Sequence, residues 1–324
     1  MKTLVTGGTG FIGSHLVEAL PGDVVCLVRK TSDTTHLESL GVELVYGDLE
    51  DPESLKRAVQ DVDNVYHLAA YYTFHGVWEK YYAINVLGTR NLIDACENID
   101  HFVYCSTTEA VGPVDNPPAD ETHPCNPQYD YGRSKVLVEE LIREKVKNGF
   151  PATILRPVGV YGPRCIDDVS YYFMVHLARN SLLTRFVAGS GNNLVDFVYV
   201  KDVVQAFLKA RTKKTVGETY FVSSEKALTY NEVYEILCRL LKREPPRLHI
   251  PPVLAKTAIA PLEYAYKLLG REDFMVHVST VDATQKDRSY SWEKARNHFG
   301  YSPEYTFEKG AEITLEWYRE NGYI

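Results

Sequence analysis

The first twenty residues, Met1–Leu20, read MKTLVTGGTGFIGSHLVEAL and decide how the chain folds. A short apolar run ends in glycines, and an amphipathic helical pattern begins immediately after them. Gly8, Gly10 and Gly13 match the spacing of the dinucleotide-binding fingerprint, and Gly7, Gly10 and Gly13 match a second spacing with glycine at every third position. Turns collect glycine for many reasons, but a cluster between a strand and a helix predicts a phosphate-binding turn.

The physical demands of such a turn explain its glycines. The strand must turn sharply into the helix, the backbone must come close to a pyrophosphate, and the helix must pack tightly on the strand. The N-terminus of the helix then presents free N–H groups and the positive end of its dipole to the phosphates. We therefore expect Gly7, Gly10 and Gly13 to bind a dinucleotide.

The composition restricts the class of protein. The chain has 324 residues, 45% of them hydrophobic, which is enough for a large core in one or two domains. Its formal net charge is −8 and no basic face for nucleic acid is evident. Its start lacks the pattern of a signal peptide, and its six scattered cysteines suggest neither disulfides nor a metal site. We predict a cytoplasmic protein that binds a small-molecule substrate.

The most apolar later stretch, Ile250–Leu269, is interrupted by three prolines and carries Lys256 and Glu263. It is too short and too interrupted for a membrane span. Three interpretations stay open: a helix pair buried in the fold, which we favour, contact with a membrane surface, and a cover over an apolar ligand.

Apolar runs alternate with helical segments through the first half of the chain. Strands are predicted at 23–28, 42–46, 64–68, 101–106 and 152–156, and the longest helices at 80–98 and 129–148. This alternation implies a parallel sheet covered on both faces. We predict an α/β doubly wound (Rossmann) sheet in residues 1–161, which bind the dinucleotide, with returns near 194–224. Residues 162–324 form mainly a smaller, discontinuous substrate lobe.

The end of the second predicted strand bears on the choice of cofactor. An acidic residue there would bind the ribose hydroxyls of NAD, whereas an arginine would accommodate the extra phosphate of NADP. Here Arg29 and Lys30 follow the strand, and no acid occurs before Asp33. We favour NADP(H); NAD(H) stays open, because both cations could be solvated loop charges. In the GDL motif, Asp48, followed by Leu49, would hydrogen-bond the adenine amino group or cap the next helix.

Tyr131 and Lys135 form a Tyr-x-x-x-Lys pair, whose spacing sets both side chains on one face of a helix. An adjacent ammonium, together with a positive nicotinamide ring, would lower the tyrosine pKa from its usual value of about 10. Only this tyrosine follows a strand that ends in a hydroxyl cluster, at 106–108. We therefore expect Tyr131 and Lys135 to be catalytic. The pairs Tyr290/Lys294 and Tyr305/Lys309 share the spacing and are expected on the surface of the smaller lobe.

Further motifs follow in the order GDL, HLAA, NVLGTRN, STTEAVG, YGRSK, LRPVGVYGP and VYVKDV. With the glycine turn they resemble the extended short-chain dehydrogenases/reductases of the NAD-dependent epimerase/dehydratase superfamily, over essentially the whole chain. The resemblance implies that Tyr131 is the acid–base, that Thr107 polarises the substrate oxygen, and that Lys135 holds the nicotinamide ribose. It also implies a cofactor lining of Phe11, Ile12, Leu68, Ala69 and Ala70, with Pro157 and Val160 near the nicotinamide.

The branch within the superfamily decides the chemistry. Nucleotide-sugar members usually carry an arginine where this chain has Val195, so a diphosphate grip is missing there. The segments LVRKTSD and YSWEKARNHFGYSP resemble instead the dihydroflavonol-reductase-like and 3β-hydroxysteroid-dehydrogenase-like branches. The aromatic stretches at 71–74 and 171–173 would suit an apolar or ring-shaped substrate, or belong to ordinary core.

Glu109 favours another branch, because the sugar dehydratases and decarboxylases of the family place an acid two residues after the catalytic threonine. A carboxylate there could exchange a proton beside a transient ketone, or it could be a solvated loop residue. With Tyr72 and Thr108 it completes the expected substrate contacts. Further residues considered for the substrate are His75 and Trp78, and, should it carry phosphate, Arg179 and Arg185.

We expect an NAD(P)(H)-dependent oxidoreductase that transfers hydride between nicotinamide and a secondary alcohol or ketone. The alternative among enzymes is a nucleotide-sugar epimerase or dehydratase with transient cofactor reduction. An alternative from another class of function is a non-catalytic regulatory protein that binds the cofactor. Helices like those at 80–98 and 129–148 pair across a two-fold axis in this family. Their apolar second faces predict a homodimer through a four-helix bundle: Tyr82, Val86, Leu92, Ile93, Val136, Val138, Leu141 and Ile142.

Overall fold

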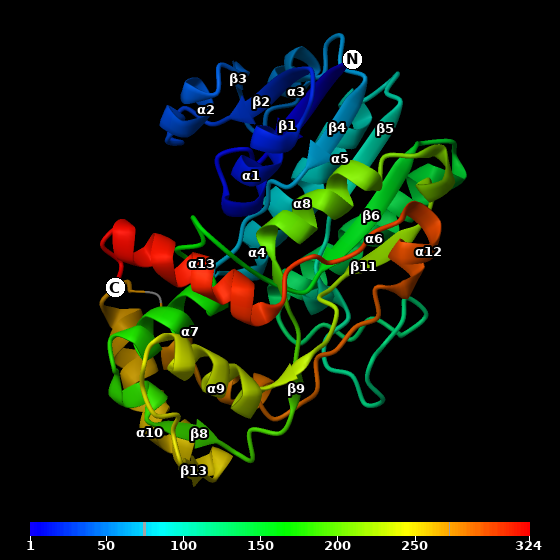
Figure 1. Cartoon of the computed structure of the whole chain (residues 1–324). Helices are drawn as coiled ribbons and strands as arrows, with labels where there is room; N and C mark the ends of the chain where they lie inside the picture. The colour runs from blue at the N-terminus through cyan, green and yellow to red at the C-terminus, as the bar shows by residue number, and fades with distance from the viewer. Residues whose placement is uncertain (74–75, 272) are drawn as a thin grey trace.

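A parallel sheet of seven strands, in the order β11-β6-β5-β4-β1-β2-β3, forms the centre of the larger lobe (Figure 1). The strands are β1 (Lys2–Thr6), β2 (Asp23–Val28), β3 (Glu43–Tyr46), β4 (Asn64–His67), β5 (His101–Cys105), β6 (Ala152–Pro157) and β11 (Thr219–Val222). The computed structural model describes residues 1–73, 76–271 and 273–324. The prediction of a doubly wound parallel sheet is confirmed.

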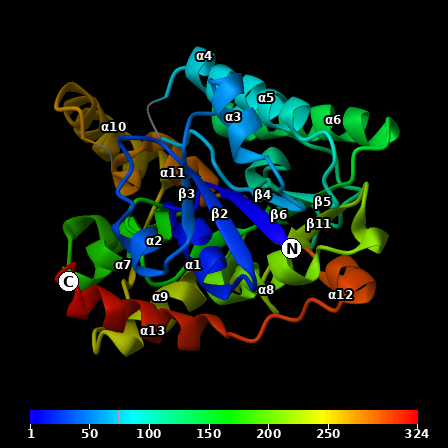
Figure 2. The same cartoon turned by 90° about the horizontal axis from the view of Figure 1, so that it is seen from above.

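Helices cover both faces of the sheet, because alternate strand residues point into two cores. Leu4 and Val25 belong to one core, and Val5 and Cys26 to the other. The sheet therefore lies as a middle layer between two sets of helices (Figure 2). One set is α3 (Pro52–Ala58), α5 (Gly88–Ala95) and α6 (Asp130–Lys147), and the other includes α1 (Phe11–Ala19) and α8 (Val200–Lys209).

The strand order reverses beside β1, with β2 on one side of it and β4 on the other. At such a point the loops leaving neighbouring strands diverge, and α/β proteins bind ligands in the crevice between them. Gly7 follows β1 at this place with a φ of +75°, and a Cβ there would lie 2.6 Å from the main-chain N of Ala69. A Cβ on Gly13 would lie 2.0 Å from the carbonyl O of Gly7. Glycine is therefore required for backbone conformation at one position and for close packing at the other.

The predicted helix at 80–98 differs from the structure. It consists of α4 (Trp78–Tyr81), a π-helical segment, η1 (Tyr82–Leu87), and α5, which ends at Ala95. Within the π-helical segment Asn85 is buried. Its side chain accepts from Tyr71 N at 2.6 Å and donates to Ser134 Oγ at 3.0 Å. The bond to Ser134 joins the helix to α6, which spans nearly the predicted 129–148. Single π turns of this kind are common near functional sites.

The smaller lobe is assembled from short elements after β6. They are β7 (Gly159–Tyr161), α7 (Val169–Ala178), β8 (Phe186–Ala188), β9 (Leu194–Val195), β10 (Phe197–Tyr199), β12 (Leu228–Thr229), α9 (Tyr230–Leu240), β13 (Leu248–Ile250), α10 (Pro252–Leu268) and α11 (Val278–Ala283). Between them α8 and β11 return to the sheet, and α12 (Glu293–Phe299) and α13 (Phe307–Glu320) end the chain. Within the described ranges, no helix is long and apolar enough to cross a membrane.

The favoured helix pair at 250–269 is wrong. The segment forms one helix, α10, in which Ala255 and Ile259 are the buried residues. Pro252 occupies the first helical position, where its missing N–H costs nothing, and Pro261 is accommodated within the helix. The prolines therefore do not divide the segment.

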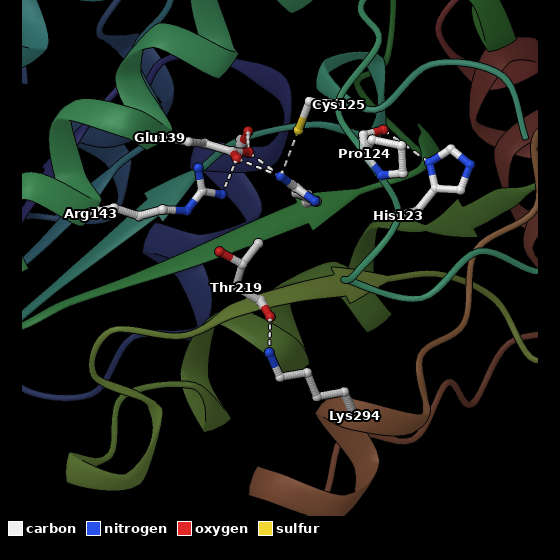
Figure 3. Close-up of polar contacts among 9 residues, drawn as sticks. His123, Pro124, Cys125, Glu139, Arg143, Thr219 and Lys294 are labelled. Atoms are coloured by element: carbon white, nitrogen blue, oxygen red, sulfur yellow. Dashed lines mark hydrogen bonds and ion pairs between the residues drawn. The ribbon is translucent and has the colours of Figure 1, made fainter.

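A buried ion pair fixes α6 against the sheet. The carboxylate of Glu139, fully buried, accepts hydrogen bonds from Arg156 Nε at 2.9 Å and Nη2 at 2.6 Å, and from Ser106 Oγ at 2.6 Å. Arg143, at the surface, donates to the same carboxylate at 2.7 Å (Figure 3). Burial alone would raise the pKa of Glu139, but the bonds and charge of Arg156 outweigh it and hold this pKa below its usual value. The network therefore joins α6 to the ends of β5 and β6.

Replacing Glu139 with glutamine should lower the free energy of unfolding by about 3–5 kcal/mol, because it leaves the buried Arg156 guanidinium without its counter-charge. Urea unfolding at neutral pH, followed by circular dichroism, measures this loss. The exposed neighbour provides the matched control, and Glu140→Gln should change the free energy by less than about 0.5 kcal/mol. Equal losses in the two variants would contradict the prediction.

The same pair also predicts a pH dependence. A carboxyl whose pKa is lower in the folded than in the unfolded chain stabilises the fold above the unfolded value, and the stabilisation is lost as the pH falls through the folded value. The stability advantage of the wild type over Glu139→Gln should therefore persist at neutral pH and disappear below the usual glutamate pKa of 4.5. An advantage that shrinks only above neutral pH would refute this assignment.

Candidate active site

A cavity of about 780 Å³ begins at the glycine turn after β1 and extends into the smaller lobe. The parallel sheet brings the carboxyl ends of β1, β4, β5 and β6 to this one edge, so residues far apart in the sequence meet there. Most of the predicted site residues line it: Gly7, Gly10, Phe11, Ile12, Gly13, Leu68, Ala70, Tyr72, Thr107, Thr108, Glu109, Tyr131, Lys135, Pro157 and Val160.

The turn end of the cavity fits a dinucleotide. Gly10 is the N-cap of α1 and makes no side-chain cap bond, so the first N–H groups of the helix stay available to a phosphate. A side chain at Gly7 or Gly13 would collide with the neighbouring backbone, so the turn could not keep this compact form. Gly7, Gly10 and Gly13 thus lie at the predicted junction of strand and helix, and their binding of a phosphate stays a prediction.

Five predicted cofactor residues are not among the residues that line the cavity. Arg29 and Lys30 are exposed directly after β2, and Ala69 lies against Gly7. Asp48 accepts from Glu50 N at 3.0 Å, and Leu49 is buried in the core. The capping alternative for Asp48 is wrong, because Asp51 is the N-cap of α3.

Tyr131 and Lys135 lie one turn apart on α6, as predicted. Lys135 Nζ donates to the carbonyl O of Cys105 at 2.7 Å and lies 5.6 Å from the centre of the Tyr131 ring. Burial lowers the pKa of Lys135 to about 8. Burial also raises the pKa of Tyr131 well above its usual value, and the nearby Asp168 and Glu109 add to this. The predicted lowering of the tyrosine pKa therefore does not arise from the protein groups.

The hydroxyl cluster after β5 is divided between two tasks. Ser106 Oγ donates a hydrogen bond to the Glu139 carboxylate, in the network that holds α6 against the sheet. Thr107 lines the cavity and its Oγ1 accepts from Glu109 N at 3.2 Å, so the hydroxyl can still donate its own proton. Thr108 is buried. This arrangement favours Thr107 over its neighbours as the hydroxyl that meets a substrate.

The far end of the cavity is apolar and aromatic. Residues of the smaller lobe form it: Phe186, Phe197, Tyr230, Tyr234, Ile259, Met275 and Val281. Of these, the sequence analysis considered only Ile259, within the stretch 250–269 that could cover an apolar ligand. These residues are spread over nearly a hundred residues without a shared period or motif, so the sequence carries no signal that groups them. The cavity therefore changes from polar main chain at one end to apolar side chains at the other.

The predicted aromatic stretches contribute two aromatic residues to the cavity wall. Tyr72 lies with its ring 4.8 Å from that of Tyr131, and Phe173 lines the cavity. Tyr171 packs instead against Tyr318 at 5.5 Å. The guanidinium of Arg133, on α6, lies 3.9 Å from the centre of the Trp78 ring. Phe74 and His75 lie outside the described residues.

Charged side chains on the cavity wall form contacts that the sequence did not reveal. Arg288 Nη1 lies 2.5 Å from Glu109 Oε1, and the two side chains are 11% and 33% exposed. Glu109 is thus a cavity residue held in an ion pair rather than a solvated loop residue. Asp168 caps α7 through Val169 N at 2.6 Å and accepts from Tyr72 Oη at 3.3 Å, and burial raises its pKa to about 6.

Three predictions about the smaller lobe need comment. Tyr290 is buried and lines the cavity, so its predicted surface position is wrong. Its hydroxyl donates to Gly112 O at 2.5 Å. Lys294, which is partly exposed, donates to Thr219 O at 2.9 Å (Figure 3). Arg179 and Arg185 are exposed and are not among the residues that line the cavity. Arg179 Nη2 donates to the carbonyl O of Tyr323 at 2.8 Å.

Comparison with known proteins gives the family. The model of the NAD dependent epimerase/dehydratase family matches residues 3–223. The chain is 31% identical to sterol demethylase protein B of Methylococcus capsulatus, with both proteins covered completely. It is 29% identical to 3beta-hydroxysteroid-dehydrogenase/decarboxylase isoform 1 of Arabidopsis thaliana, with 97% of this chain and 78% of that protein covered.

Among solved structures, UDP-glucuronic acid 4-epimerase from Bacillus cereus in complex with NAD is similar, with a TM-score of 0.79, 25% identity and 99% of each chain covered. The alignments with these proteins extend over both lobes of the chain. The expected resemblance is confirmed: the chain is an enzyme of the NAD-dependent epimerase/dehydratase family, among the extended short-chain dehydrogenases/reductases.

Proposed function

We propose that the protein is an NADP(H)-dependent oxidoreductase that transfers hydride between nicotinamide and a secondary alcohol or ketone of an apolar, ring-shaped substrate. One observation carries the proposal: Thr107, Tyr131 and Lys135 lie in a continuous cavity between the glycine turn and an apolar, aromatic wall. Pockets of this kind hold an apolar ligand and orient it through a few polar groups. The sterol and steroid named for the two relatives support the same substrate class.

The charges on the wall favour a substrate without a diphosphate. Five carboxyl groups line the cavity, from Glu109, Asp130, Asp167, Asp168 and Asp196. Of the cations on its walls, Lys135 donates to the Cys105 carbonyl and Arg288 is paired with Glu109. An anionic diphosphate would meet an excess of like charge in a largely apolar space. Val195, at the position where nucleotide-sugar enzymes usually have an arginine, is also apolar. These features favour a neutral ketone or alcohol.

In the proposed reaction Tyr131 exchanges a proton with the substrate oxygen, and the Thr107 hydroxyl donates a hydrogen bond to that oxygen. Lys135 would hold the nicotinamide ribose, and the bound cofactor supplies or accepts the hydride. Because burial raises its pKa, Tyr131 keeps its proton at neutral pH and is ready to donate it, as reduction of a ketone requires. The aromatic wall keeps water away from the reacting carbon.

Purified protein mixed with NADPH and apolar cyclic ketones should oxidise the cofactor steadily, seen as a continuous loss of nicotinamide absorbance. Tyr131→Phe should reduce turnover by about two to four orders of magnitude, with little change in cofactor affinity, because the proton donor is lost. Tyr305→Phe is the matched control, since this residue shares the Tyr-x-x-x-Lys spacing outside the site. A Tyr131→Phe enzyme that keeps most of its activity would sink the assignment.

A nucleotide-sugar epimerase or dehydratase is the second candidate. It is favoured by Glu109, which lies two residues after Thr107 on the cavity wall and is held there by Arg288. Such an enzyme would convert its substrate completely without net change in nicotinamide absorbance. Tight cofactor binding without turnover of either substrate class would favour the non-catalytic regulatory protein.

We further propose that Arg29 selects NADP(H), because it is exposed at the end of β2, where the 2′-phosphate is bound in this type of fold. Calorimetric titration should show tighter binding of NADP than of NAD. Arg29→Ala should remove about 1.5–3 kcal/mol of that preference, since a guanidinium–phosphate bond is charge-assisted. Arg57→Ala, an exposed arginine of α3, should leave it unchanged. Equal affinity of the wild type for both cofactors would refute the role.

We also propose a homodimer through α5, η1 and α6. Tyr82, Val136 and Leu141 stay partly exposed on these helices, and the other apolar residues predicted for the interface are buried within the single chain. Light scattering at micromolar concentration should give twice the single-chain mass of 36.7 kDa. Leu141→Glu should halve it, whereas Leu40→Glu, in the sheet domain, should not. A wild-type mass near 36.7 kDa would exclude the dimer.

A further inference from the structure

Helix α10 turns an apolar side outward. Its exposed large side chains are Val253, Leu254, Leu262, Tyr264 and Leu268, followed by Leu269, with exposed fractions between 44% and 70%. At 3.6 residues per turn these positions form one continuous side of the helix, together with the exposed Ala258, Ala260, Pro261 and Ala265. A helix on the surface of a globular protein normally places its apolar side on the core. In α10 that order is reversed.

Two of the three charged residues of α10 are turned away from this side, toward α11. Lys256 Nζ donates to Asp282 of α11 at 2.7 Å, and Glu263 accepts from Val278 N at 2.9 Å. The inner side of the helix is narrow: Ala255 and Ile259 pack against α11 and also line the cavity. The helix therefore separates the apolar end of the cavity from its own exposed apolar side. It lies at the edge of the smaller lobe in both views (Figures 1 and 2).

The segment around α10 is basic in an acidic protein. Residues 242–271 contain six cations (Lys242, Arg243, Arg247, Lys256, Lys267 and Arg271) and two carboxylates (Glu244 and Glu263), a formal net charge of +4 in a chain of net charge −8. Lys242, Arg243 and Arg247 are exposed before the helix, and Arg271 is exposed after it. An exposed apolar side flanked by cations is typical of helices that lie in the interface of a membrane.

We propose that α10 binds the surface of an anionic lipid bilayer, lying in the plane of the interface with its outer side among the lipids. The charge selects this partner: two copies of a segment with a net charge of +4 would repel each other, whereas acidic headgroups attract it. A helix of seventeen residues is also too short to span the bilayer. An apolar ligand in the membrane would then be separated from the cavity by about one helix diameter, roughly 10 Å.

Flotation of the full-length protein with vesicles tests the proposal without measuring activity. The protein should float with vesicles of phosphatidylcholine and phosphatidylglycerol, and less with phosphatidylcholine alone. Leu254→Glu and Leu268→Glu should each lower the affinity on the order of tenfold or more, because each removes a buried leucine from the lipid contact. Lys267→Gln should lower it about fivefold. Leu40→Glu, in the sheet domain, is the matched control and should bind like the wild type.

Circular dichroism of each variant verifies that it is folded. A wild type that stays with the soluble fraction in the presence of anionic vesicles overturns the proposal, as does equal loss of binding in Leu40→Glu and Leu254→Glu. A doubled mass that Leu254→Glu abolishes, without vesicle binding, would identify a second copy as the occupant of this side and would also overturn it. Retained vesicle binding by a protein inactive toward ketones would leave this proposal standing and reject only the proposed function.

Discussion

The ion pair between Glu139 and Arg156 is the interaction on which the geometry of the site depends. Both side chains are almost completely buried, at 0% and 2% exposure, where an unpaired charge would cost several kcal/mol. The pair is compensated by two parallel hydrogen bonds and by the Ser106 hydroxyl. Because Glu139 lies on the same side of α6 as Lys135 and Tyr131, the helix cannot rotate without breaking the pair. The positions of the two catalytic candidates are therefore set by charges that take no part in the chemistry.

The cavity joins two kinds of surface that the fold supplies separately. Its cofactor end is built from main-chain atoms of a strand–turn–helix unit. Glycines are needed there because a Cβ atom would collide with the neighbouring backbone. Its substrate end is built from side chains of the smaller lobe, whose segments are threaded between returns of the chain to the sheet. Helix α10 gives its inner side to this end and keeps an apolar outer side. This helix therefore lies between the ligand cavity and the surface of the molecule.

The acid–base properties of the site follow from burial more than from neighbouring cations. The ammonium of Lys135 is turned to the Cys105 carbonyl and its pKa is lowered to about 8, while the pKa of Tyr131 is raised. A sequence pattern of tyrosine and lysine suggests that the lysine acidifies the phenol. In the folded chain the two groups are desolvated together, so burial raises the pKa of the phenol and lowers that of the ammonium.

The sequence by itself determined the sheet, the glycine turn, the Tyr131–Lys135 face of α6 and the family, because each depends on contacts within a few residues or on motifs read in order. The tertiary structure alone decided the Glu109–Arg288 pair, the burial of Tyr290, the apolar wall of the cavity and the π segment that positions Asn85. It also decided that α10 is exposed, although its apolar residues were evident in the sequence. These features join residues as far apart as 109 and 288, and hydrophobic periodicity shows which side of a segment is apolar but not whether another part of the chain covers it.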